Sequence, residues 1–218
     1  MKYKSIILII FLKSLFSLSQ VHAKTNDLTL LGKIIYLDPG HGGIDSGATS
    51  GKYLEKNLNL EITKKLATAL GKKGAIVYLT RDGDYDLSDN NYSRKRSDLS
   101  NRARLINESN CDLYLSIHLN SSTDTSWRGI QVFYNNINSQ NKEIATIMTN
   151  TIKQITSNIK NLKEDNNYYM YKQITVPGIL IELGFISNQD DLYLLKQNQY
   201  QEKLAQIITK GIENYFQK

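Results

Sequence analysis

The sequence is poor in several residue types, and each scarcity limits the kind of protein it can encode. A single cysteine, Cys111, excludes an internal disulfide, so the fold must depend on an apolar core or on a bound metal. Cys111 precedes an apolar run and is expected to be a buried thiol. Proline occurs only twice and tryptophan once, whereas tyrosine occurs 14 times. With 40% hydrophobic and 22% charged residues among 218, the composition indicates one globular domain.

Long apolar runs are also lacking. The N-terminal run Ile6–Leu18 is interrupted by a lysine and serines, and it is too short to predict a membrane-spanning helix. Lys2 and Lys4 precede this run, and small residues up to Ala23 form a cleavage site. We therefore expect a secretory signal over residues 1–23 and an exported, secreted protein. The alternative is an uncleaved anchor that keeps the protein associated with the membrane through its N-terminus.

Strong net charge is missing once the leader is set aside. The whole chain carries +6, but residues 1–23 hold three lysines and no acid, which leaves +3. A charge of this size suits an anionic polymer such as cell wall. It argues against a nucleic-acid partner, which normally requires a clustered basic face.

The remaining chain alternates between two hydrophobic spacings. Apolar residues at every third or fourth position predict helices, the first of them beginning near Glu55. Short continuous apolar runs predict strands near residues 33–38, 75–80, 112–118, 129–134 and 178–182. Such alternation predicts an α/β fold over residues 24–218, a single domain with a mostly parallel central sheet covered by helices on both faces. The polar segment 81–101 is expected to be an exposed loop.

The first predicted strand runs into a stretch that carries chemistry, DPGHGGIDSGA at residues 38–48. Pro39 and the glycines end the strand and form a loop that presents His41, and Glu55 starts the helix that follows. Functional sites of open α/β sheets form beyond the carboxyl ends of the strands. Two more of these predicted strands end at His118 and Glu182, so the four side chains are expected to converge.

The scarcity of histidine strengthens this expectation. Of three histidines, one lies in the leader, and the other two, His41 and His118, both lie at predicted strand ends. Two imidazoles and one carboxylate form a common catalytic zinc site, although no local HExxH segment is present. We predict that His41, Glu55 and His118 bind one Zn²⁺ ion. Glu182 is predicted to be the catalytic base, because hydrolysis requires a group that takes a proton from water.

Three other polar residues are weaker candidates. Asp38 and Asp45 either orient His41 or only form the turns in which they stand. Asn120, just beyond His118, is a candidate for orienting substrate. The aspartates of segment 82–89 are expected to be solvated, because they lack the glycine and terminal glutamate of a calcium loop.

Six segments in order carry a family resemblance: DPGHGGIDSGA, EKNLNLEI, TRD, NRARLIN, DLYLSIHLNS and ILIELGFISN. Together they resemble the zinc-dependent N-acetylmuramoyl-L-alanine amidases of the amidase-3 type over about Lys33–Gln217. The resemblance implies zinc ligation by His41, Glu55 and His118 and a catalytic role for Glu182. It also implies the substrate, the amide between N-acetylmuramic acid and L-alanine in peptidoglycan.

Two features narrow the resemblance. The link from Tyr134 to Asn141 is too short for the inserted helix that blocks zinc in division-associated relatives, and no wall-binding domain is expected. In both respects the chain is similar to sporulation-specific, CwlD-type amidases. That implies a role on spore cortex, in muramic-δ-lactam formation and germination, and suggests a helper or activator protein. The alternatives are another exported zinc hydrolase, such as a stem-peptide peptidase, and a catalytically silent wall-binding module.

Overall fold

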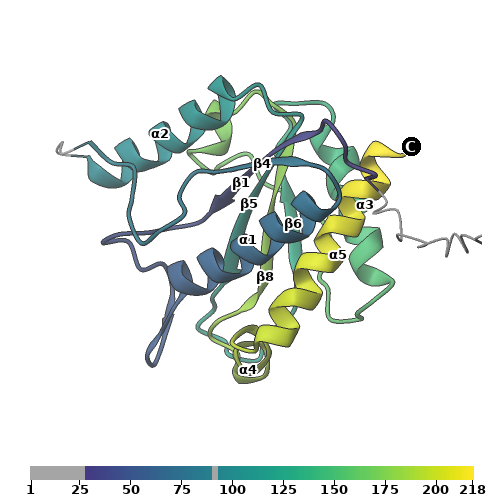
Figure 1. The fold of residues 1–218 in the computed structure, drawn as a ribbon. Helices are drawn as coiled ribbons and strands as arrows, with labels where there is room; N and C mark the ends of the chain where they lie inside the picture. The colour runs from purple at the N-terminus through teal and green to yellow at the C-terminus, as the bar shows by residue number, and fades with distance from the viewer. Residues whose placement is uncertain (1–27, 90–92) are drawn as a thin grey trace, which may run out of the picture.

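Short aliphatic and β-branched runs form the central sheet in the computed structural model, which describes residues 28–89 and 93–218 (Figure 1). The predicted signal segment, residues 1–23, lies outside the described residues. The six strands are β1 (Ile34–Pro39), β4 (Ile76–Leu79), β5 (Leu113–Asn120), β6 (Gln131–Tyr134), β7 (Lys163–Glu164) and β8 (Gly178–Phe185). Their order is β4-β1-β5-β8-β6-β7, and β6–β8 is the one antiparallel pair among the described strands of this six-stranded sheet. The predicted mostly parallel sheet is therefore confirmed.

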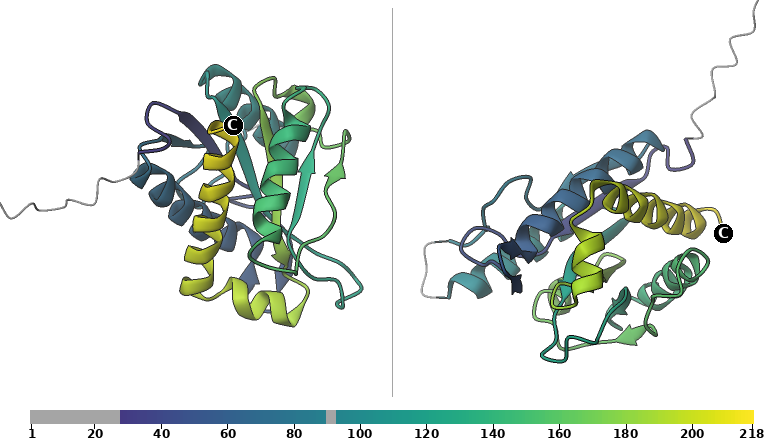
Figure 2. Two further views of the ribbon diagram at one scale, coloured as in Figure 1. Left: turned by 90° about the vertical axis from the view of Figure 1, so that its right-hand side faces the viewer. Right: turned by 90° about the horizontal axis from the view of Figure 1, so that it is seen from below.

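Helices cover both faces of this sheet, as predicted. The larger layer contains α1 (Glu55–Lys72), α3 (Asn141–Lys153) and α5 (Asn198–Phe216), and Figure 2 shows α3 and α5 lying side by side. The opposite face carries α2 (Arg94–Glu108) and the short 3₁₀ helix η1 (Tyr171–Gln173). The remaining described elements are the hairpin β2 (Thr49–Ser50) and β3 (Tyr53–Leu54), and α4 (Gln189–Leu195).

The two faces differ in chemistry because side chains alternate along each strand. In β5, Leu115 and Ile117 join an aliphatic core with α1, α3 and α5. Tyr114 belongs to a smaller, aromatic cluster on the other face, which Leu180 of β8 shares. His118 and Glu182 fall in the same alternation as Tyr114 and Leu180. The candidate site therefore lies over the face covered by α2 and η1.

Two predicted strand ends were wrong. β5 continues to Asn120 and β8 continues to Phe185, so His118 and Glu182 lie inside strands and not at their ends. The two residues are paired partners in adjacent parallel strands. The prediction failed because it ended each apolar run at its first charged or polar site residue, whereas the ladder continues past both residues with a bulge after His118.

The predicted exposed loop over residues 81–101 was also wrong in part. α2 already begins at Arg94, and Arg81 and Asp98 are buried. A run of charged residues was interpreted as solvated, but these side chains bind buried polar groups that the local pattern does not reveal. In β4, by contrast, the side chains are more exposed than the apolar sequence suggests. β4 is an edge strand, and Ile76 and Tyr78 are about half exposed despite the apolar run.

Two further expectations concern single segments. Cys111 is buried, as predicted. Residues 135–140, which join β6 to α3, form turns and contain no helix, in agreement with the predicted short link. Among the helices that the structure describes, none has the length and apolar character needed to cross a bilayer.

Candidate metal centre

His41 stands in a tight loop directly after β1. Its backbone is left-handed, with φ of 62°, a conformation uncommon for residues other than glycine. Two buried arginines hold the loop in this shape. Arg102 donates to the carbonyl oxygen of His41 at 2.7 Å, and Arg81 donates to the carbonyl oxygens of Pro39 and Gly40 at 2.9 and 3.0 Å. The orientation of His41 therefore depends on hydrogen bonds from outside the loop.

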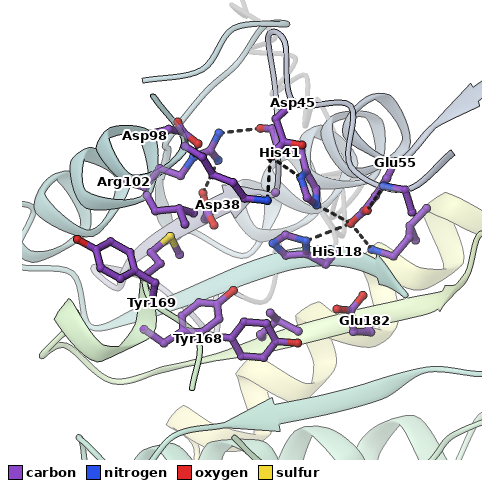
Figure 3. A pocket seen from close by; sticks show the side chains of 18 of the residues that line it. Asp38, His41, Asp45, Glu55, Asp98, Arg102, His118, Tyr168, Tyr169 and Glu182 are labelled. Atoms are coloured by element: carbon purple, nitrogen blue, oxygen red, sulfur yellow. Dashed lines mark hydrogen bonds and ion pairs between the residues drawn. The ribbon is translucent and has the colours of Figure 1, made fainter. Parts of the chain in front are cut away.

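The structure brings His41, Glu55 and His118 together (Figure 3). Glu55 Oε1 lies 3.2 Å from His41 Nε2 and 3.1 Å from His118 Nδ1. The potential ligand atoms of the three residues all lie within 4.8 Å of one another. Two imidazole nitrogens and one carboxylate oxygen that converge in this way are a donor set for a transition metal such as zinc.

Neighbouring groups orient these donors. Asp45 Oδ2 lies 3.0 Å from His41 Nδ1, so the carboxylate can accept the proton on that nitrogen and leave Nε2 free toward the site. Glu55 accepts backbone N–H bonds from Ala48 at 2.8 Å and from Leu119 at 3.0 Å. Burial alone would raise the pKa of Glu55, but its hydrogen bonds to His118 and His41 hold that pKa well below its usual range. Glu55 is therefore an ionised, fixed carboxylate.

Gly40 is a site residue that the sequence reasoning treated only as a loop former. A Cβ atom at this position would lie 2.1 Å from Cε1 of the His118 ring, which is far inside contact distance. Only glycine lets the loop pack directly on the imidazole. The close approach joins β1 and β5, so no local sequence signal indicates it.

Glu182 lies on β8 beside His118 in the ladder and lines a cavity of about 310 Å³ together with the three potential ligands. Its side chain is buried, and Oε2 has no hydrogen-bond partner among the described residues. Burial, with a further contribution from Glu55, raises the pKa of Glu182 to about 7, although His118 and His41 act in the opposite direction. An unpaired carboxyl group of this kind is suited to exchange protons near neutral pH.

The three weaker candidates have different surroundings. Asp45 supports His41 directly, whereas Asp38 does not contact the imidazole. Asp38 is fully buried and accepts hydrogen bonds from Thr80 at 2.7 Å, from Arg102 at 2.8 Å and from Ser116 at 2.6 Å. Arg102 also donates to the carbonyl oxygen of His41, so Asp38 is linked to His41 through Arg102, and its role in orienting His41 stays a prediction.

Asn120 lines the cavity, and its side-chain oxygen accepts a hydrogen bond from the backbone N–H of Ser121 at 2.8 Å. A role for Asn120 in orienting substrate stays a prediction. Sequence reasoning also missed the tyrosines at residues 168–171, which form another wall of the cavity. Their local signal was three tyrosines within four positions.

A potential metal-ligand triad beside an unpaired buried carboxyl group, on an α/β sheet, defines the class of metal-dependent hydrolases. The particular family follows from comparison with known proteins. The family model for N-acetylmuramoyl-L-alanine amidase, Amidase_3, matches residues 35–214, and the chain belongs to this family. The resemblance found in the sequence is thus confirmed.

Named relatives agree with this assignment. The chain is 42% identical over 194 residues to the germination-specific N-acetylmuramoyl-L-alanine amidase of Bacillus subtilis, covering 87% of this chain and 82% of that protein. It is 36% identical to a probable cell wall amidase, LytH, of Staphylococcus aureus, covering 86% of this chain and 60% of LytH.

Solved structures give the same result. The CwlD amidase from Clostridioides difficile, in complex with the GerS lipoprotein, superposes with a TM-score of 0.81 at 35% identity. That match covers 85% of this chain and 98% of the other. The amidase AmiC2 of Nostoc punctiforme gives a TM-score of 0.74 at 31% identity, with the same two coverages.

Proposed function

We propose that this chain is a zinc-dependent amidase that hydrolyses the bond between N-acetylmuramic acid and L-alanine in peptidoglycan, with spore cortex as its site of action. One observation carries the proposal. Three potential metal ligands converge within 4.8 Å beside the buried, unpaired Glu182, in a chain 42% identical to a germination-specific amidase. Muramic-δ-lactam formation during sporulation, and hence germination, is the process in which this activity takes part.

His41, Glu55 and His118 are the residues that would hold the zinc. When bound there, Zn²⁺ supplies a Lewis acid that lowers the pKa of water and polarises the scissile carbonyl. Asp45 keeps the His41 ring in the tautomer that turns Nε2 to the site. The backbone N–H groups of Ala48 and Leu119 keep the Glu55 carboxylate in place.

Glu182 moves the proton in this reaction. Its carboxylate takes a proton from the attacking water, and the resulting carboxylic acid delivers that proton to the nitrogen of the departing L-alanine. A pKa of about 7 suits both transfers, because the group is neither strongly acidic nor permanently protonated at neutral pH. Oε2 of this buried side chain accepts no hydrogen bond from any described residue, so no other protein group holds it in the acceptor role that the proton transfer requires.

Export and a protein partner are part of the same proposal. The leader-like residues 1–23 and the names of the relatives support action on the cell-wall or spore-cortex side of the membrane. The C. difficile relative was solved in complex with a lipoprotein, which supports a helper protein for this chain. Full zinc occupancy and full activity of the purified protein alone would remove the need for such a helper.

Mass spectrometry of digested peptidoglycan tests the reaction. We expect intact stem peptides with a free L-alanine amino group, together with glycan that has lost its peptides. Cut stem peptides would instead establish a peptidase. Zinc-loaded protein that binds the wall and, with or without a helper, releases no product would establish a silent binding module. His118→Ala should lose the zinc, as measured by elemental analysis, and should give no product.

A further inference from the structure

Tyr168 lines the metal-site cavity and has no part in the reaction described above. In Figure 3, Tyr168 and Glu182 lie on the side of the cavity opposite His41. The Tyr168 ring is held edge-on by two aromatic neighbours. Its centroid lies 5.3 Å from that of Tyr171, at an interplanar angle of 75°, and 6.3 Å from that of Phe133, at 89°. The position of the ring is therefore fixed by packing.

The hydroxyl group distinguishes Tyr168 from the tyrosines next to it. The hydroxyl of Tyr169 lies 3.2 Å from that of Ser100 in α2, and the Arg96 guanidinium covers its ring at 4.8 Å. Tyr171 is buried in the aromatic cluster. Tyr168 is 39% exposed, and its hydroxyl makes no hydrogen bond to any residue in the described ranges 28–89 and 93–218.

The charges around Tyr168 keep this hydroxyl protonated. Burial, together with the carboxylates of Glu182, Asp165 and Glu55, raises the pKa of Tyr168 to about 12. The group is therefore a neutral hydrogen-bond donor at every pH at which a wall enzyme works. Because Glu182 is an acceptor and a proton carrier, it cannot supply a fixed donor on this wall.

Attack on an amide places negative charge on the carbonyl oxygen, and a preorganised donor stabilises that charge. We propose that the Tyr168 hydroxyl donates a hydrogen bond to the scissile carbonyl oxygen of the muramoyl amide as the carbon becomes tetrahedral. Its O–H bond stays intact throughout, so no proton, electron pair or leaving group passes through Tyr168. The inference rests on the proposed amidase function, and it makes Tyr168 a catalytic residue.

The test compares two variants that each lose one hydroxyl. Tyr168→Phe keeps the ring and its packing, and it should lower kcat about 10²–10³-fold, the range seen when one donor of this kind is removed. KM should change less than twofold, with zinc content and Tm unchanged. Tyr193→Phe is the matched control, since Tyr193 lies exposed on α4 and does not line this cavity, and it should keep wild-type kcat.

Two kinetic results would overturn the inference. A Tyr168→Phe kcat within twofold of wild type would show that the hydroxyl does not act in the reaction. A raised KM with unchanged kcat would show that the hydroxyl binds the substrate and the transition state equally well, and so does not stabilise the transition state selectively. If wild-type, zinc-loaded protein cleaves no muramoyl peptide with or without a helper, the proposed function itself fails, and that outcome is visible before either variant is compared.

Binding gives a second measure that does not require turnover. A phosphinate that replaces the muramoyl amide carries a tetrahedral, anionic centre, whereas the released stem peptide does not. By calorimetry, Tyr168→Phe should bind the phosphinate about 10²-fold more weakly than wild type and bind the stem peptide equally well. Equal loss for both ligands would indicate a general binding contact and would contradict the assignment.

Discussion

His41 and His118 turn different ring nitrogens toward Glu55, and the two imidazoles are held in place in different ways. His118 uses Nδ1, the nitrogen nearer its own backbone, and Glu55 Oε1 also accepts the N–H of the adjacent Leu119. His41 reaches the same oxygen with Nε2 from a loop. His118 is thus held in place by β5 itself, whereas the position of His41 depends on the hydrogen bonds that support its loop.

A substitution at Glu182 should impair catalysis without affecting metal binding. Glu182→Gln keeps the size of the side chain but cannot accept a proton, so kcat should fall about 10²–10⁴-fold. Zinc content should stay at wild-type level, because Glu182 is not in the predicted ligand set. Kinetics on muropeptides and elemental analysis on the same sample measure both quantities.

The control for this variant is Glu164→Gln on the exposed strand β7, which removes a carboxylate that does not line the cavity and should leave kcat unchanged. If Glu182→Gln retained more than a tenth of wild-type kcat, another group would have to be the base. If it lost zinc, Glu182 would instead belong to the metal site.

At the scale of elements, one buried salt-bridge network joins α2 to the loop after β1. Arg102 pairs with Asp98 within α2 at 2.9 Å and with Asp38 of β1 at 2.8 Å, and all three side chains are buried. The same guanidinium bonds the carbonyl oxygens of Pro39 and His41. α2 therefore stabilises the loop that carries His41, one of the potential metal ligands.

Arg102→Ala should destabilise the protein by about 3–5 kcal/mol, because Asp38 would keep a buried charge without its partner. Arg104→Ala in the same helix is the matched control. Arg104 pairs with Glu108 at 3.0 Å on the exposed surface, so its loss should cost less than about 1 kcal/mol. Urea unfolding of both variants measures the difference in their free energy of unfolding. Equal losses of stability would contradict a stabilising role for the Arg102 salt-bridge network.

Elements with a strong local pattern were predictable from sequence, and elements that depend on distant partners were not. α1 begins at Glu55 as predicted, since its apolar residues recur with helical spacing into a single core face. The start of α2 was missed because its first turns are polar, and Arg94 there pairs with Asp86 from the preceding loop. The edge position of β4 was likewise invisible, because strand order is not encoded in hydrophobicity.

For the candidate site too, features with a local sequence signal were predictable and features that depend on distant partners were not. The gathering of His41, Glu55, His118 and Glu182 was predictable, because parallel strands deliver their side chains to one end of the sheet. The buried arginines, the close approach at Gly40 and the wall containing Tyr168 were not. Each of these depends on what packs across from it, and that information is spread over segments far apart in the chain.

At the scale of the whole molecule, metal binding should stabilise the fold. The three potential ligands come from the loop after β1, from the start of α1 and from β5, so they are far apart in an unfolded chain. A ligand that binds only the native state at 100 times its Kd adds about 2.7 kcal/mol. For a protein of this size, that corresponds to about 5–10 °C in Tm.

Thermal unfolding before and after treatment with a chelator measures this stabilisation. Wild-type protein should lose about 5–10 °C in the metal-free state and regain it when Zn²⁺ is restored. His118→Ala should show no response to either treatment. If chelation left the wild-type Tm unchanged, His41, Glu55 and His118 would not form a metal site that stabilises the folded protein.

The pairing of His118 with Glu182 also sets a limit on how this molecule can evolve. A shift of one residue in β5 or β8 would turn either side chain to the opposite face, into the aliphatic core beside Ile117 and Ile181. Substitutions along these strands can be accommodated one at a time, but an insertion or deletion moves every later side chain at once. Active descendants should therefore vary in length only outside residues 113–118 and 178–182.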